Sequence, residues 1–119
     1  MHKLVILIER LDDEAALDEA WPQFLHLAES MPGLRRESTS RVEDYLYGSS
    51  PVALVHELYF DSLEAAQAAM TSPQGRAAGR LLQTMTSGRM ALFFAEHKED
   101  ELENIRKFQG QADQPGGPA

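Results

Sequence analysis

The chain has 119 residues, of which 43% are hydrophobic and 25% are charged, a composition typical of one folded domain. Nineteen acidic and eleven basic side chains give a formal net charge of -8, which disfavours nucleic acid and anionic lipid as partners. No cysteine is present, so disulfides, thiolate nucleophiles and cysteine-ligated metals are excluded. We expect a cytoplasmic protein without a membrane span, because the N-terminal apolar run 4–8 is too short to cross a bilayer and lacks the features of a signal peptide.

The first half of the chain predicts a strand, a helix and a second strand. Residues 4–8 are apolar and β-branched, which indicates a strand buried on both faces. N-cap candidates and acidic residues at 11–14 open a helix that runs to about Ser30. Pro22 predicts either a kink in this helix or a short first turn before the main helix. Polar alternation over 34–43 then predicts a long strand, either at a sheet edge or reaching past the core.

The second half predicts a strand, helices and a final strand. Residues 52–60 form an apolar run typical of a central strand. Asp61 to Glu64 has the form of a capping box, so a helix should begin there and end near Thr71. The following Ser72-Pro73 predicts the start of a further helix, because proline fits the first helical position. Residues 90–95 predict a fourth strand, short, apolar and central.

The order strand, helix, strand, strand, helix, strand predicts an α+β fold of the ferredoxin-like βαββαβ type, with a four-stranded antiparallel sheet and its helices on one face. Because the sheet has apolar residues on both faces, the second face needs a cover. The simplest cover is the sheet of another copy, so we expect a homodimer in which two sheets form a barrel. We expect residues 1–98 to form this domain, and 99–119 to form a C-terminal arm and a disordered tail.

Four short segments resemble one known family. They are Lys3-Leu4-Val5, Pro32 to Arg36, Glu57 to Ala65, and Ser72 to Gly75. Together, in this order and spacing, they resemble the EthD family of the dimeric α+β barrel superfamily over residues 2–97. The resemblance implies a ferredoxin-like protomer, a dimeric barrel, and a cavity either between sheet and helices or within the barrel. It does not imply a defined reaction.

The chain departs from the family pattern in its first helix. Many family members carry a tryptophan followed shortly by His-Gly-Pro, whereas here Trp21 is followed by Pro22 and then His26 without Gly-Pro. The resemblance therefore matches Trp21, and His26 only loosely, to the family's motif.

The predicted central strand carries one ionisable residue on each face, His56 and Glu57. Strand alternation sends them to opposite faces, so they cannot serve one site. If Glu57 faces the cavity, it is a base or an acceptor, with Tyr59 as a donor; otherwise it pairs with an arginine of the adjacent strand, among Arg35, Arg36 and Arg41. If His56 faces the cavity, it is the acid–base candidate; otherwise it is a structural histidine. The catalytic candidates are therefore His56, Glu57 and Tyr59.

The aromatic side chains Trp21 and Phe24 either line an apolar pocket or belong to the ordinary core. We expect ligand-binding roles for Trp21, Phe24, His26 and Arg36. The histidines lack the spacing of a metal site, and no nucleophile motif or phosphate loop occurs, so we expect neither a metal nor a cofactor.

Two functions follow from these features. The first is a homodimeric protein that binds a small apolar or aromatic molecule, or acts as an accessory protein. The second is a cofactor-independent enzyme of the oxygenase, isomerase or lyase class with an apolar cavity. Which of His56 and Glu57 faces the cavity is the question that the structure must answer.

Overall fold

The computed structural model describes residues 1–103. The elements, in order, are β1 (His2–Glu9), α1 (Glu14–Glu29), β2 (Arg36–Arg41), β3 (Val52–Phe60), α2 (Leu63–Thr71), α3 (Pro73–Thr86) and β4 (Met90–Glu96). The strands pair antiparallel in the order β2-β3-β1-β4. The predicted ferredoxin-like α+β fold is therefore confirmed, and the further helix expected after Ser72 is α3.

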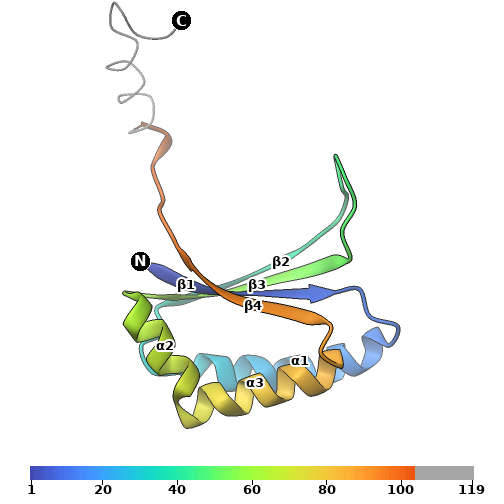
Figure 1. The fold of residues 1–119 in the computed structure, drawn as a ribbon, viewed down its shortest axis with the longest axis horizontal. Coiled ribbons are helices and arrows are strands. Elements are labelled where there is room, and N and C mark those ends of the chain that lie inside the picture. The colour runs from blue at the N-terminus through green and yellow to red at the C-terminus, as the bar shows by residue number, and fades with distance from the viewer. Residues whose placement is uncertain (104–119) are drawn as a thin grey trace, which may run out of the picture.

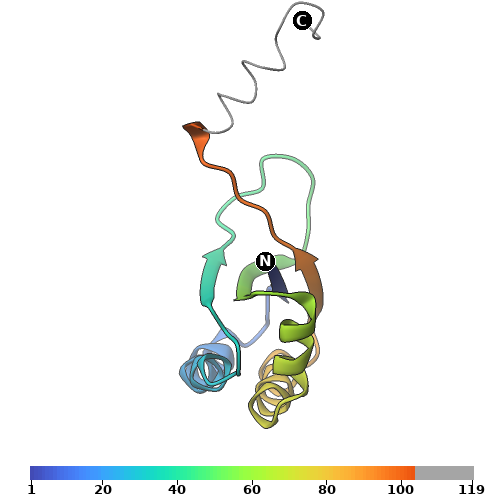
Figure 2. The same ribbon diagram turned by 90° about the vertical axis from the view of Figure 1, so that its left-hand side faces the viewer.

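The fold has two layers. All three helices lie on one face of the sheet, with α1 beneath one side and the α2–α3 pair beneath the other (Figures 1 and 2). No described element covers the second face, which we call the open face. Alternation places Val5, Leu7, Val55 and Phe93 on this open face, because their strand neighbours point into the core.

The core lies between the sheet and the helices. Every second residue of β1 and β3 points to the helices, and the matching helical residues follow the 3.6-residue period. The fully buried members include Ile6, Ile8, Leu58, Phe60, Phe24 and Leu82. The register between β1 and β3, in which Leu4 lies opposite Leu58, keeps both apolar rows on the same face.

Side-chain caps fix where the helices begin. Asp13 Oδ1 accepts a hydrogen bond from the Ala16 amide at 3.2 Å, and α1 then runs without interruption through Pro22. The predicted capping box at Asp61 is wrong by one residue, because Ser62 Oγ accepts the Ala65 amide at 3.0 Å. Asp61 instead binds the guanidinium of Arg35.

The two outer strands differ from their predictions. The strand predicted over 34–43 is β2, which is at the edge as expected but spans only Arg36–Arg41. Beyond these bounds, pairing continues only as single bonds, such as the Arg35 amide to the Tyr59 carbonyl at 2.8 Å. The prediction of a central β4 is wrong: β4 is the other edge, and Phe93 and Phe94 are exposed in the described chain.

Two further predictions concern a membrane span and the C-terminal boundary of the domain. No helix among residues 1–103 is both long and apolar enough to cross a bilayer. The domain boundary at residue 98 stays a prediction, and the arm and tail predicted for 99–119 lie, from residue 104 on, outside the described residues.

Candidate functional site

His56 points to the helices and is fully buried. Its Nδ1 lies 2.8 Å from Thr39 Oγ1, and its Nε2 lies 3.1 Å from Glu37 Oε2. The rings of Trp21 and Phe24 meet the imidazole edge-on, with centroids at 5.2 and 5.7 Å. Both ring nitrogens therefore have partners on β2, and aromatic side chains of α1 exclude solvent from the ring.

The burial of this cluster shifts two pKa values in opposite directions. Burial lowers the pKa of His56 to about 4, although the charges of Glu57 and Glu29 oppose the shift. Burial also raises the pKa of Glu37 to about 7, with a hydrogen bond from protonated Glu37 to Glu29 as the next cause. When Glu37 is ionised it can only accept, so Nε2 of a neutral His56 carries the proton and Nδ1 accepts from Thr39. This arrangement is that of a structural histidine.

Glu57 lies on the opposite, open face, as alternation requires. It forms an ion pair with Lys3 of β1, and both side chains are about four-fifths covered. The hydroxyl of Tyr59 donates to Glu57 Oε2 at 3.5 Å and lies 3.4 Å from Ser38 Oγ. The predicted arginine partner for Glu57 is wrong, because β3 has two neighbours and β1, not β2, supplies the cation.

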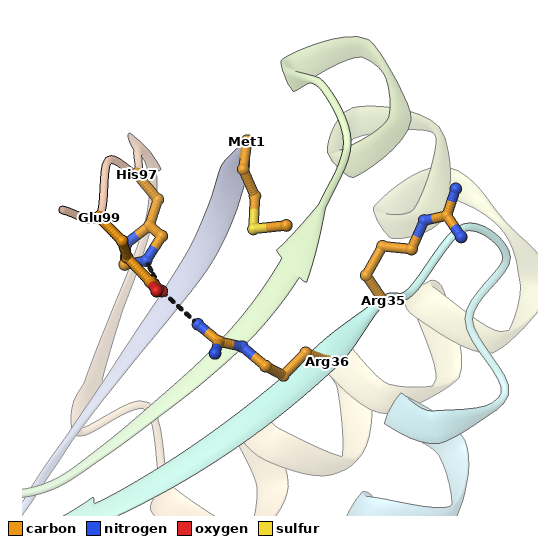
Figure 3. A pocket seen from close by; sticks show the side chains of 5 residues that line it. All are labelled: Met1, Arg35, Arg36, His97 and Glu99. Carbon is orange, nitrogen blue, oxygen red and sulfur yellow. Dashed lines mark hydrogen bonds and ion pairs between the residues drawn. The ribbon is translucent and has the colours of Figure 1, made fainter. Parts of the chain in front are cut away.

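A hollow of about 420 Å³ lies at the end of the open face where β1 and β2 begin and β4 ends. It is lined by Met1, Arg35, Arg36, His97 and Glu99 (Figure 3). Arg36 Nη2 donates to Glu99 Oε1 at 2.6 Å, and His97 Nε2 lies 2.5 Å from the same oxygen. Hydrogen bonds from His97 and then Arg36 lower the pKa of Glu99, so its carboxyl group is ionised at neutral pH.

The ring of Tyr59 contacts two residues that line this hollow, Arg36 and His97. The Arg36 guanidinium carbon lies 4.2 Å from the centroid of the Tyr59 ring, and the His97 ring meets Tyr59 edge-on at 4.9 Å. The stacking holds the guanidinium over an aromatic plane, which limits its freedom before any ligand arrives. The hollow thus combines the fixed guanidinium of Arg36 with the apolar side chain of Met1.

The structure brings together only part of the predicted site. Arg36 and Tyr59 meet at the hollow, with Glu57 hydrogen-bonded to Tyr59. His56 lies on the other face of the sheet with Trp21 and Phe24, which pack in the core layer, and His26 is exposed in the last turn of α1.

Among the residues that line the hollow, only Arg36 was a site residue predicted from the sequence. His97 continues the alternation of Phe93 and Ala95, which places it on the open face, and this signal was available in the sequence. Glu99 lies beyond the last strand, and no periodic pattern predicts its return to Arg36, 63 residues earlier.

Comparisons with known proteins identify the family. No family model matches the sequence. The crystal structure of an ethyl tert-butyl ether D (EthD) family protein from Bacillus halodurans matches with a TM-score of 0.76 and 30% identity, covering 82% of this chain and 99% of that chain. The chain belongs to the EthD family. The present chain is also 28% identical to an uncharacterized 11.0 kDa protein in the thcB-thcC intergenic region of Rhodococcus erythropolis. That match covers 82% of the present chain and 96% of the relative.

More distant structures share the fold alone. A dimeric ferredoxin-like protein of unknown function from Jannaschia has a TM-score of 0.62 and 19% identity, with 82% of this EthD family protein and all of that chain covered. SnoaB from Streptomyces nogalater, a cofactor-independent oxygenase, has a TM-score of 0.65 and 12% identity, with 85% and 96% covered. At these identities the matches show only that the described elements adopt a shared fold. The function has to be inferred from the residues of the site.

Proposed function

We propose that this EthD family protein is a homodimer that binds a small apolar or aromatic molecule, in a binding or accessory role. The observation that carries the proposal is the hollow at the end of the open face, where Arg36 and His97 converge beside an apolar wall. Its volume of about 420 Å³ falls in the range of small-molecule sites. A site of this size with few fixed polar groups orients a ligand without needing a reactive side chain.

The dimer is proposed from the open face. Phe93 is 45% exposed in the described chain, and Val55 and Leu7 lie on the same face. The solvent-exposed face of an antiparallel sheet is ordinarily polar. The apolar side chains on this open face therefore favour its burial against another protein surface. A second copy of the sheet is the cover we propose, as in the structural relatives that are described as dimeric.

The same reasoning extends to location and partners. The formal charge of -8 disfavours nucleic acid, and the lack of cysteine is compatible with a reducing compartment, so we propose a cytoplasmic protein whose ligand is a small molecule.

An enzyme remains the second candidate because of one feature of the open face. Glu57 and Tyr59 are hydrogen-bonded there and would be enclosed by a second sheet, which is where an acid–base pair would be required. The ion pair with Lys3 already occupies the Glu57 carboxylate, and His56 is confined to the core. The binding role is therefore better supported than catalysis.

Native mass spectrometry of freshly purified protein tests the proposal. We expect a mass of twice 13.3 kDa, with additional small mass where a ligand co-purifies. Ligand-observed NMR with a panel of aromatic acids, amides and alcohols then measures binding directly, and at least one class should bind at millimolar concentration. A monomeric mass would contradict the dimer, and failure of every class to bind would contradict the binding function.

A further inference from the structure

Glu99 reaches back from the segment after β4 to the donors of the hollow (Figure 3). One of its carboxylate oxygens, Oε1, accepts from both Arg36 and His97, at 2.6 and 2.5 Å. The two donors come from opposite edges of the sheet, since Arg36 begins β2 and His97 follows β4. A carboxylate thus bridges two strands that do not otherwise pair.

This bridge is weak as a structural contact. The side chains of Arg36 and Glu99 are 52% and 60% exposed, and ion pairs of such exposure contribute about 0 to 1 kcal/mol. A group with equal charge and a better fit can therefore displace Glu99 at small cost. The donors would remain in place, because Arg36 also lies on the Tyr59 ring.

The other charged group of the hollow is already neutralised. Arg35 donates through Nε and Nη2 to both oxygens of Asp61, so its charge is satisfied by a local partner. Met1 points its apolar side chain into the space between the charged groups (Figure 3). The hollow thus presents two hydrogen-bond donors at one end, the guanidinium of Arg36 and the imidazole of His97, beside the apolar side chain of Met1.

We propose that the ligand of this hollow is a small organic carboxylate with an apolar or aromatic body, and that Glu99 occupies the place of the ligand's carboxylate. The inference rests on the proposed binding function and names its ligand class. Arg36 can donate two parallel N–H groups to a free carboxylate, whereas it donates to Glu99 through Nη2 alone. Binding of the ligand releases Glu99, so the segment after β4 competes with the ligand.

The test is an affinity measurement with matched probes, benzoate against the uncharged benzamide. Wild type should prefer benzoate. Glu99→Gln removes the competing charge and should tighten benzoate binding by about two- to fivefold, the range of an exposed ion pair, without changing benzamide binding. Arg36→Gln should weaken benzoate binding by about tenfold or more, because it removes the bidentate donor.

Arg35→Gln is the matched control, because Arg35 lines the same hollow but is held by Asp61; its effect on benzoate should be smaller than that of Arg36→Gln. All three positions are exposed, and circular dichroism checks that each variant is folded. Equal affinity for benzoate and benzamide, or unchanged benzoate binding in Glu99→Gln, would overturn the carboxylate inference and leave the binding function standing. If neither these two probes nor any class of the wider panel binds, both proposals fail together.

Discussion

At the scale of single residues, burial reverses the protonation states of His56 and Glu37 relative to those that their ordinary pKa values predict. In the unfolded chain between pH 4.5 and 6.5, the histidine holds a proton and the glutamate does not. In the folded protein, burial leaves His56 neutral while Glu37 keeps its proton until about pH 7. Folded and unfolded states therefore bind the same number of protons at these two residues, and the pair adds almost no pH dependence to stability in this window.

Glu37→Gln should make the hidden contribution of His56 visible. A histidine whose pKa is lowered on folding stabilises fully above pH 6.5, and this contribution is lost as the pH falls toward 4. The raised pKa of Glu37 acts in the opposite sense, since its contribution is full below pH 4.5 and is lost as the pH rises through 7. Without Glu37, the free energy of unfolding should rise by about 2 to 3 kcal/mol between pH 4.5 and 6.5.

Urea denaturation at a series of pH values measures this effect. Glu43→Gln, at an exposed position of the β2–β3 loop, is the matched control and should follow the wild-type pH profile. Parallel profiles for wild type and Glu37→Gln would mean that the two pKa shifts are not linked to folding as described.

At the scale of elements, the backbones of α2 and α3 approach closely where the two helices join. Ser72 ends one helix and begins the next, because its hydroxyl donates to the Ala69 carbonyl and accepts from the Gly75 amide. A Cβ atom on Gly75 would lie 2.1 Å from the Ala69 carbonyl oxygen and 2.7 Å from Met70 Cα. Both are backbone atoms, so a side chain at this position would force the two helices apart.

Gly75→Ala should therefore destabilise the protein by about 2 kcal/mol or more, the scale of overpacking in a buried contact. Gly79→Ala in the same helix is the matched control, because nothing lies within 4 Å of its Cβ position. Alanine has the higher helix propensity, so this variant should gain up to about 1 kcal/mol. Chemical denaturation measures both, and an equal effect of the two substitutions would contradict the close approach at Gly75.

The elements themselves were predictable from the sequence, because each follows a local period. Alternation also placed His56 and Glu57 on opposite faces. It could not say which face meets the helices, because the apolar residues of β3 occur on both faces. The partner of Glu57 and the edge position of β4 depend on strand order, which no local pattern determines. The apolar character of β4, which suggested a central strand, fits instead an edge strand that contributes side chains to the open face.

At the scale of the whole molecule, the open face decides whether the protomer is complete alone. Phe93 lies opposite Val5 in the β1–β4 register, halfway along the edge strand β4, and is 45% exposed. In the proposed dimer its side chain is buried against the second sheet, where a charge without a partner would be costly. The hollow at Arg36 and His97 lies at the end of the same face, so assembly and ligand binding are expected to depend on each other.

Phe93→Lys should therefore convert the dimer to a monomer, because each copy would bring a buried ammonium group to a sheet-to-sheet interface. Light scattering at micromolar concentration measures the mass, which should fall from twice 13.3 kDa to 13.3 kDa. Ala68→Lys, on the exposed side of α2 in the helical layer, introduces the same charge away from the open face and should leave the dimer intact. If Phe93→Lys stays dimeric while folded, the two copies do not meet through this part of the open face.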